Sequence, residues 1–216
     1  MFHDTRQPRT RSLKVIAGIT GVILAGGQSR RFGANKALAL LAGRRLIEHP
    51  AGVLSGLFAQ RLLVTNTPEQ YDFLGWPMIA DRFPGAGPLA GIHAALCEAE
   101  DERIFVTACD MPTLCPETIH FLCACPSGWD AVVPWLHDGP EPLCAVYAKS
   151  ALPALVESLR QGVFQVQAVL ARLRTRMVSK SELPPDAAGP GRFVNVNTPA
   201  DLAVLAKEPP PKDPLT

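Results

Sequence analysis

The sequence predicts an α/β fold of three layers, αβα, in which helices cover both faces of a mainly parallel sheet. Short apolar runs of strand length alternate along the chain with segments of helical length, an order typical of βαβ units. The chain has 216 residues, of which 47% are hydrophobic and 19% are charged, which suits one compact domain with a buried core. Glycines and aspartates follow several of the apolar runs, where open α/β sheets bind their ligands.

The first strand is predicted over residues 19–24, a short apolar run that leads into a pair of glycines. A helix is predicted over 46–58, where Pro50 fits the first turn better than a helix interior. The elements that follow are a strand over 61–65, a helical turn over 68–74 and a strand over 78–80.

A helix is predicted over 88–98, because Pro88 suits the first helical position and the glycine-containing segment 85–87 forms the loop before it. The later strands are predicted over 104–108, 131–133, 143–147 and 193–196. The later helices are predicted over 116–123, 151–159, 166–173 and 199 to about 206. We expect one domain, residues 18–207, between disordered tails at 1–17 and 208–216, since no linker or repeat divides the chain.

Charge and composition argue against several classes of protein. The formal net charge is +1, so no global field favours nucleic acid or a membrane surface as a partner. No apolar run has the length of a membrane span, and the basic start lacks the apolar stretch of a signal peptide. The cysteines show no zinc-ligand spacing, and a chain of this size needs no disulfide framework. We therefore expect a cytoplasmic protein with reduced thiols. The six cysteines are Cys97, Cys109, Cys115, Cys123, Cys125 and Cys144.

The loop after the first strand is a candidate for phosphate binding. Residues 24–36 read LAGGQSRRFGANK, and their glycines let backbone N–H groups approach phosphate oxygens. Arg31 adds a forked donor and Lys36 a point charge. Many glycine-rich loops are only tight turns, but two arginines and a lysine in one short loop favour a triphosphate. The loop has neither the Gly-Lys-Ser/Thr of a Walker motif nor the spacing of a dinucleotide fingerprint.

Asp110 directly follows the apolar run at 104–108 in the sequence ACDMP. A lone carboxylate at a strand end suits magnesium, which takes few protein carboxylates together with phosphate oxygens. The alternative is a carboxylate that caps the helix predicted from residue 116. The residues alone leave both interpretations open.

Other polar residues also follow predicted strands. Asp81 is interpreted either as a carboxylate that recognises a base or as part of a surface turn with Arg82. Asn195 and Asn197 are two residues apart at the end of a predicted strand, so their side chains should lie on one face. The alternative is a polar strand end before Thr198, which fits the N-cap of the last helix.

Together these motifs resemble the molybdenum cofactor guanylyltransferase family over roughly residues 19 to 206. The opening motif is shared with many nucleotidylyltransferases, whereas the segments GPLAG and NVNTP are more specific to this family. The matching pieces are Leu24 to Gly27, Arg31 to Lys36, Asp81, Gly87 to Gly91, Cys109 to Pro112 and Asn195 to Pro199.

The resemblance implies a Rossmann-like sheet of the nucleotidyltransferase type and a magnesium-dependent enzyme. Members of this family bind GTP, join GMP to the terminal phosphate of molybdopterin and release pyrophosphate. Cofactor-delivery proteins and molybdoenzyme chaperones are the further partners it implies. The nucleotide-binding residues would be Leu24, Ala25, Gly26, Gly27, Lys36, Asn66, Asp81 and Asp110. The catalytic residues would be Arg31, Lys36 and Asp110, with Asp110 on the metal, and the acceptor would contact Asn195 and Asn197.

Two departures from the family pattern stand out. Asn35 occupies a position where aspartate commonly precedes the lysine, which removes a charge near the phosphates. The loop at 162–166 lacks the arginine expected after Gly162, which bears on acceptor contacts.

A phosphate acceptor is already ionised at neutral pH, so such a transfer needs no general base and depends on positioning and on offsetting anionic repulsion. Two related activities compete with this interpretation: cytidylyl transfer to the same cofactor and nucleotidyl transfer to a sugar phosphate. Asp81 favours guanine, whose pairing edge offers two adjacent donors. A regulatory nucleotide-binding module without catalysis is the alternative of a different class, and the presence of Lys36 and Asp110 argues against it.

Overall fold

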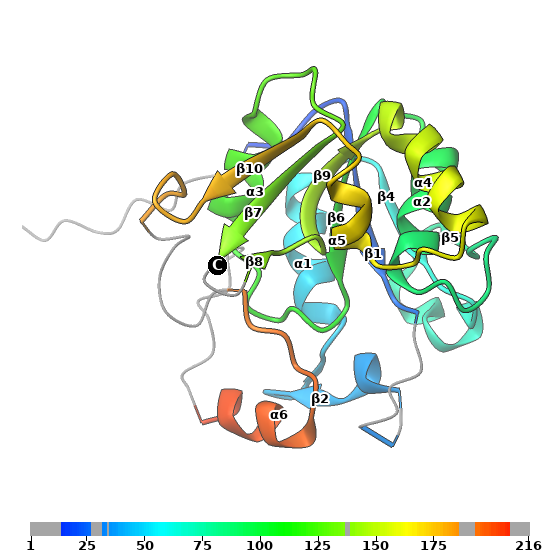
Figure 1. Ribbon diagram of the computed structural model, residues 1–216. Helices are drawn as coiled ribbons and strands as arrows, with labels where there is room; N and C mark the ends of the chain where they lie inside the picture. The colour runs from blue at the N-terminus through cyan, green and yellow to red at the C-terminus, as the bar shows by residue number, and fades with distance from the viewer. Residues whose placement is uncertain (1–13, 27–31, 34, 137–138, 186–192, 208–216) are drawn as a thin grey trace, which may run out of the picture.

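The computed structural model describes residues 14–26, 32–33, 35–136, 139–185 and 193–207 of the chain (Figure 1). The strand order of its main sheet is β10-β7-β9-β6-β1-β4-β5, with the short β8 paired to β7. The strands of this sheet are β1 (Ile19–Leu24), β4 (Arg61–Val64), β5 (Met78–Ile79), β6 (Arg103–Ala108), β7 (Ala131–Leu136), β8 (Gly139–Pro140), β9 (Cys144–Ala148) and β10 (Thr175–Ser179). The parallel pairs are β1–β4, β1–β6, β4–β5 and β7–β10, which confirms the mainly parallel sheet.

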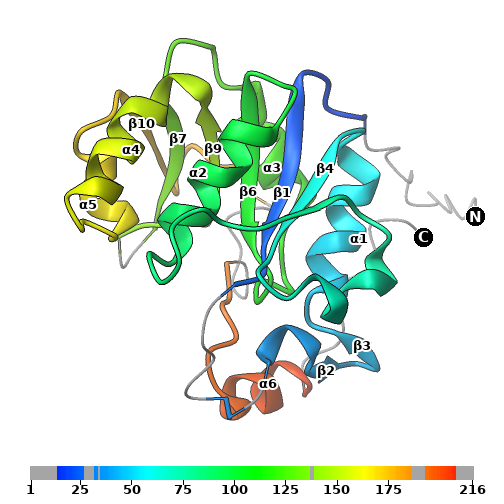
Figure 2. The same cartoon turned by 90° about the vertical axis from the view of Figure 1, so that its right-hand side faces the viewer.

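Helices cover both faces of this sheet (Figure 2). On one face, Leu54 of α1 belongs to the same buried cluster as Ile23 of β1. On the other, Ile92 of α2 and Leu155 of α4 join Val22 of β1. The helices are α1 (Glu48–Leu57), α2 (Pro88–Glu98), α3 (Pro116–Ala124), α4 (Leu152–Arg160), α5 (Val166–Leu170) and α6 (Pro199–Leu205). Four 3-10 turns complete the set: η1 (Lys36–Leu38), η2 (Pro68–Gln70), η3 (Asp72–Leu74) and η4 (Lys149–Ala151).

The central strand β1 is buried along its whole length, with helices packed on both sides. Such a strand carries an apolar sequence on both faces, as ITGVIL does. The one glycine in it, Gly21, makes room for Phe58, because a Cβ at residue 21 would lie 2.6 Å from the ring of Phe58. The chain is held to the sheet from Ile16 onward, where the Ile16 N–H donates to the Leu57 carbonyl (2.7 Å).

Strand β9 runs antiparallel to both of its neighbours, β6 and β7. The pairing of β6 with β9 places Thr107 opposite Cys144, and the Ala108 N–H donates to the Leu143 carbonyl (3.2 Å). The start of β9 therefore lies beside the carboxyl end of β6. This brings residues that precede β9 to the edge of the sheet where the parallel strands end.

Beyond that edge, the hairpin of β2 (Leu40–Leu41) and β3 (Arg44–Arg45) packs near α6, a small lobe seen below the sheet in Figures 1 and 2. Leu41, Leu46 and Val196 form its buried centre. A capping box starts α6, in which the side chain of Thr198 accepts from the Asp201 N–H and that of Asp201 accepts from the Thr198 N–H. Thr198 is thus confirmed as the N-cap.

The strand predicted over residues 193–196 is wrong, because this segment enters no ladder. Val196 instead donates its N–H to the Asp110 carbonyl (2.9 Å), and its side chain is buried in the small lobe rather than in the sheet. The edge strand is β10, whose sequence TRMVS lacks the apolar run of a central strand and was missed for that reason.

Some helix boundaries also differ from the prediction. The helix predicted from residue 46 begins at Glu48, with Pro50 in its first turn, because the N–H groups of Leu46 and Ile47 bond back to the β2 side of the small lobe. The helix predicted over 166–173 ends at Leu170.

The structure forms no disulfide between the six cysteines, all of which lie in its described part. Among the described residues, no helix has the length and apolar character needed to cross a membrane.

A polar cluster joins the edge strand to the rest of the sheet. Asp130, just before β7, accepts from the backbone N–H of Arg174 (2.9 Å), from its Nη2 (2.8 Å) and from the Ser150 hydroxyl (2.6 Å). Arg174 leads directly into β10. These hydrogen bonds, those from the Arg174 side chain first, hold the pKa of the Asp130 carboxyl well below its usual range.

Asp130→Asn should lower the free energy of unfolding by about 1.5–3 kcal/mol at pH 7, because it removes charge-assisted hydrogen bonds. The depressed pKa means that this stabilisation is present above the unfolded pKa of about 4 and is lost as the pH falls below it. Urea unfolding of both proteins at pH 7 and pH 3 measures the difference, which should shrink at pH 3. Asp72→Asn, at an exposed carboxylate of η3, is the control. An unchanged difference at pH 3 would contradict the assignment.

Candidate functional site

A cleft of about 750 Å³ opens at the carboxyl edge of the parallel strands. The ends of β1, β4 and β6, the loop before α2, the residues before β9 and the segment before α6 all line it. The polar and charged residues of its lining are Lys36, Thr65, Asn66, Asp81, Asp110, Glu141, Asn195 and Asn197. Segments far apart in the sequence thus meet where the sheet's topology predicts a ligand site.

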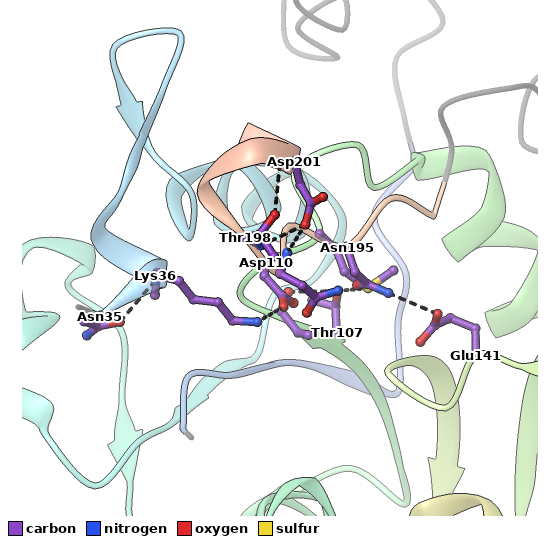
Figure 3. Close-up of polar contacts among 12 residues, drawn as sticks. Asn35, Lys36, Thr107, Asp110, Glu141, Asn195, Thr198 and Asp201 are labelled. Carbon is purple, nitrogen blue, oxygen red and sulfur yellow. Dashed lines mark hydrogen bonds and ion pairs between the residues drawn. The ribbon is translucent and has the colours of Figure 1, made fainter. Parts of the chain in front are cut away.

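Lys36 and Asp110 form an ion pair across this cleft (Figure 3). The position of Lys36 is fixed by Asn35, the N-cap of η1, whose Oδ1 accepts from the Ala37 N–H (3.1 Å). The Asn35 Nδ2 also donates to the Tyr71 hydroxyl (2.8 Å). A carboxylate has no such donor, so the asparagine that departs from the family pattern ties this turn to η2 and η3.

Asp110 is 6% exposed, and its Oδ1, although buried, has no hydrogen-bond partner among the residues that the structure describes. The capping interpretation is wrong, because α3 begins after Cys115 and no side chain caps it. A buried carboxylate oxygen without a donor is unfavourable unless a cation or ligand satisfies it. Asp110 therefore presents one oxygen to Lys36 and one to a missing partner.

Asp81 and Asn66 form a second polar pair in the cleft. The Asn66 Nδ2 donates to Asp81 Oδ2 (2.7 Å), and the Asp81 N–H donates to Asn66 Oδ1 (3.1 Å). The Phe83 N–H donates to Asp81 Oδ1 (3.2 Å). A carboxylate offers about four acceptor positions, so each Asp81 oxygen keeps capacity for a further donor. These bonds hold the Asp81 carboxylate in the cleft. A simple surface turn with Arg82 would not need them.

Of the loop residues after β1, Leu24 and Gly26 line the cleft. Ala25 does not: its side chain is buried in the core, and its N–H donates to the Val64 carbonyl (2.9 Å). A Cβ at Gly26 would meet no atom within 4 Å, so its backbone borders open space. Gly27 and Arg31, the other predicted contacts of this loop, lie outside the described residues.

The loop before α2 also borders the cleft through its glycines. Gly87 has φ 64° and ψ −150°, a conformation that only glycine adopts readily. Gly91, inside α2, allows close contact, because a Cβ there would lie 3.1 Å from Leu24. The chain thus brings backbone rather than side chains to this wall of the cleft.

Asn195 and Asn197 both line the cleft although their segment is no strand. The Asn195 Nδ2 donates to Glu141 Oε2 (3.3 Å), as Figure 3 shows. Burial raises the pKa of Glu141 above its usual range, while hydrogen bonds from the Leu143 N–H and from Asn195 oppose the shift. Sequence reasoning missed Glu141, whose only signal is an acidic residue shortly before an apolar strand.

The charged side chains of the described lining are one lysine and three carboxylates, Asp81, Asp110 and Glu141, with a formal sum of −2. A phosphate ligand would be repelled by that sum unless cations join it. No group of three or more His, Cys, Asp or Glu residues that could hold a metal occurs among the described residues. The orphaned Asp110 oxygen fits a divalent ion that takes one or two carboxylates and completes its shell with ligand oxygens and water.

Comparisons with known proteins agree with this geometry. Residues 21–177 match the MobA-like NTP transferase domain. A probable molybdenum cofactor guanylyltransferase of Pelotomaculum thermopropionicum is 42% identical over 183 residues, or 85% of this chain and 89% of the relative.

Solved structures give the same picture. Molybdopterin-guanine dinucleotide biosynthesis protein A of Archaeoglobus fulgidus superposes with a TM-score of 0.75 and 33% identity, covering 87% of this chain and 97% of that one. A cytidylyltransferase for 2-C-methyl-D-erythritol 4-phosphate from Thermus thermophilus has a TM-score of 0.64 but 16% identity, covering 86% of this chain and 96% of that one. This second likeness shows the fold alone.

Gly87→Ala should lower the free energy of unfolding by about 1–3 kcal/mol, because alanine is strained at this φ and ψ. Gly75→Ala is the matched control, since Gly75 has a similar φ of 63° but a ψ of 23°, in the left-handed region that costs other residues roughly 1 kcal/mol. Urea unfolding of the three proteins measures both losses. Equal losses at the two positions would show that the loop before α2 relaxes freely.

Proposed function

The chain belongs to the MobA-like NTP transferases, among the molybdenum cofactor guanylyltransferases, and we propose that it transfers GMP from GTP to the terminal phosphate of molybdopterin. Its enzyme class is therefore nucleotidyltransferase. One observation carries the assignment of roles within the cleft. Its polar groups follow the order of the sheet, with Asp81 after β5, Asn66 after β4, Gly26 after β1, Asp110 after β6 and Glu141 before β9.

The base would lie at the β4–β5 end of the cleft. Guanine presents two adjacent N–H donors on its pairing edge, and the two oxygens of one carboxylate accept both. Asp81 has the acceptor capacity for this, and Asn66 fixes its orientation. The Asn66 amide keeps a further N–H and a further acceptor position beyond its bonds to Asp81, so Asn66 would contact the nucleotide as well as orient Asp81.

The phosphates would lie over the loop after β1, beside Gly26 and Lys36. The lysine ammonium lies in the cleft, where it can turn from Asp110 to phosphate oxygens. We keep Gly27 and Arg31 as further phosphate contacts of this loop. Ala25 would contribute through its backbone carbonyl only, since its side chain and N–H are used within the domain.

Asp110 would hold magnesium through Oδ1, which has no partner in the described part of the chain. When bound, the ion would supply the positive charge that the described side chains of the cleft lack. The chain's own contribution is placement: β6 ends at Ala108, and the Asp110 backbone is held by the N–H of Val196.

The acceptor would approach from the β9 side, where Asn195 and Asn197 offer amide groups. An oxygen of its phosphate attacks the α-phosphorus of GTP, the bond from that phosphorus to the bridging oxygen of the β-phosphate breaks, and pyrophosphate leaves. No proton has to be removed from an ionised phosphate, so no general base is needed. Lys36 and Arg31 would offset the charge on the leaving pyrophosphate.

We also propose that the enzyme acts in the cytoplasm as one domain over residues 18–207. Cofactor-delivery proteins and molybdoenzyme chaperones would be its partners, because a labile dinucleotide cofactor benefits from direct transfer. We propose neither nucleic acid nor membranes as partners, because a net charge of +1 attracts neither strongly.

The direct test incubates the protein with magnesium, molybdopterin and GTP labelled in the α-phosphate, and analyses the products by chromatography. We expect a labelled guanine dinucleotide together with pyrophosphate. Parallel reactions contain CTP, or a sugar phosphate in place of molybdopterin, and should give no labelled product. Product with CTP instead would identify a cytidylyltransferase, and nucleotide binding without product in any reaction would favour the regulatory module.

Asp81→Ala should erode the preference for GTP over CTP by roughly tenfold or more, because a hydrogen bond to a charged group contributes about 1.5–3 kcal/mol. Calorimetric titration with each nucleotide measures the preference. The matched control is Asp72→Ala, an exposed carboxylate outside the cleft. If the Asp81 variant binds both nucleotides more weakly by the same factor, then Asp81 supports the loop and does not read the base.

A further inference from the structure

We propose that Glu141 is a second carboxylate for the divalent cation and acts together with Asp110. The inference rests on the proposed function, which places a nucleotide and a cation in this cleft. It adds a residue from the start of β9 to a site otherwise built on the ends of parallel strands. Three observations support it: the position of Glu141 in the cleft, the lack of a cationic partner for its carboxylate among the described residues, and the negative charge of the proposed ligands.

The position of Glu141 follows from the antiparallel pairing of β6 with β9. Thr107 pairs with Cys144, and the Ala108 N–H donates to the Leu143 carbonyl (3.2 Å). Beyond this point both segments leave the ladder at the edge of the sheet where the cleft opens. The carboxylates of Asp110 and Glu141 both line that cleft.

The backbone holds Glu141 in this place. Its N–H donates to the Pro134 carbonyl of β7 (2.9 Å), and its own carbonyl accepts from the Cys144 N–H (3.3 Å). Strand β7 and the start of β9 therefore fix the backbone of the residue. The hydrogen bond from Asn195 holds its carboxylate at the cleft.

The carboxylate of Glu141 has only neutral partners among the described residues. The Asn195 Nδ2 donates to it at 3.3 Å, and the Leu143 N–H donates to it as well. The described ion pairs do not include it. Lys36, the cation of the described lining, is taken by Asp110. A half-buried carboxylate without a cation is unfavourable, as is the orphaned Oδ1 of Asp110 in the same cleft.

The charge of the proposed ligands argues against a glutamate that serves only to orient Asn195. Two polyanionic substrates meet there, and a further negative charge would repel both. An amide would orient Asn195 equally well and without that repulsion. A divalent ion removes the conflict, because magnesium and manganese prefer carboxylate oxygens and accept one or two from protein beside phosphate. Glu141 and Asp110 together supply two.

Manganese binding measured by the EPR signal of free Mn²⁺, in the presence of an α,β-methylene GTP analogue, tests the inference without turnover. Glu141→Gln keeps the shape and the hydrogen bond from Asn195 but removes the charge. It should weaken Mn²⁺ binding by about tenfold or more. Asp72→Asn is the control: it removes the charge of an exposed carboxylate outside the cleft, and should leave Mn²⁺ affinity within about twofold, because salt screens distant exposed charges.

Wild-type Mn²⁺ affinity in a folded Glu141→Gln protein, with a normal melting temperature, would overturn the inference. So would a loss in Asp72→Asn as large as that in Glu141→Gln, since the effect would then come from the net charge of the protein and not from a ligand. If Glu141→Gln does not fold, Glu141→Ala serves the same comparison.

Asp110→Asn separates this inference from the proposed function. Loss of Mn²⁺ binding in Asp110→Asn but not in Glu141→Gln overturns the role of Glu141 and leaves the Asp110 site standing. Normal binding in both variants removes the cation site of the proposed function itself. Cation-free binding of the GTP analogue, measured by calorimetry, should become tighter in Glu141→Gln and not weaker, because the substitution removes a negative charge from the cleft.

Discussion

The buried centre of the sheet is the constraint on which the site depends. Because helices cover both faces of β1 and β6, these strands have almost no place for a polar side chain along their length. A polar side chain on these strands needs a hydrogen-bond partner, as Thr20 shows by donating to Asp101 (2.8 Å). Polar groups can stand only after the last buried residue, where the strands open onto the cleft. The core therefore decides where the chemistry is placed.

The cleft assembled there is electrostatically incomplete without its ligands. Lys36 satisfies one oxygen of Asp110, the other oxygen has no donor, and Glu141 has only neutral partners among the described residues. Such an arrangement costs stability in the free protein, as functional sites often do. It suits a site that must draw a cation and two anionic substrates together and release the product afterwards.

The two ends of the cleft are built by different means. At the end proposed for the base, Asn66 and Asp81 follow the parallel strands β4 and β5 and orient each other through a pair of hydrogen bonds. At the end proposed for the acceptor, the antiparallel β9 and the segment before α6 meet, where Asn195 bonds Glu141. Asp110 lies between them, and its backbone carbonyl is the point to which the final segment of the domain is attached. A transfer reaction needs this arrangement, since nucleotide and acceptor have to meet at one phosphorus.

The sequence alone determined the alternation of strands and helices, the glycine loop and the aspartates at strand ends, because burial and turn formation are local in pattern. It also carried the family motifs from Leu24 to Pro199. Only the tertiary structure decided that residues 193–196 serve a loop contact and that residues 175–179 form the edge strand, because ladder pairing depends on partners distant in the chain. It likewise decided that Ala25 faces the core and that Glu141 lines the same cleft as Asp110. The antiparallel pairing of β6 with β9 brings these distant segments together, and no spacing in the sequence encodes that pairing.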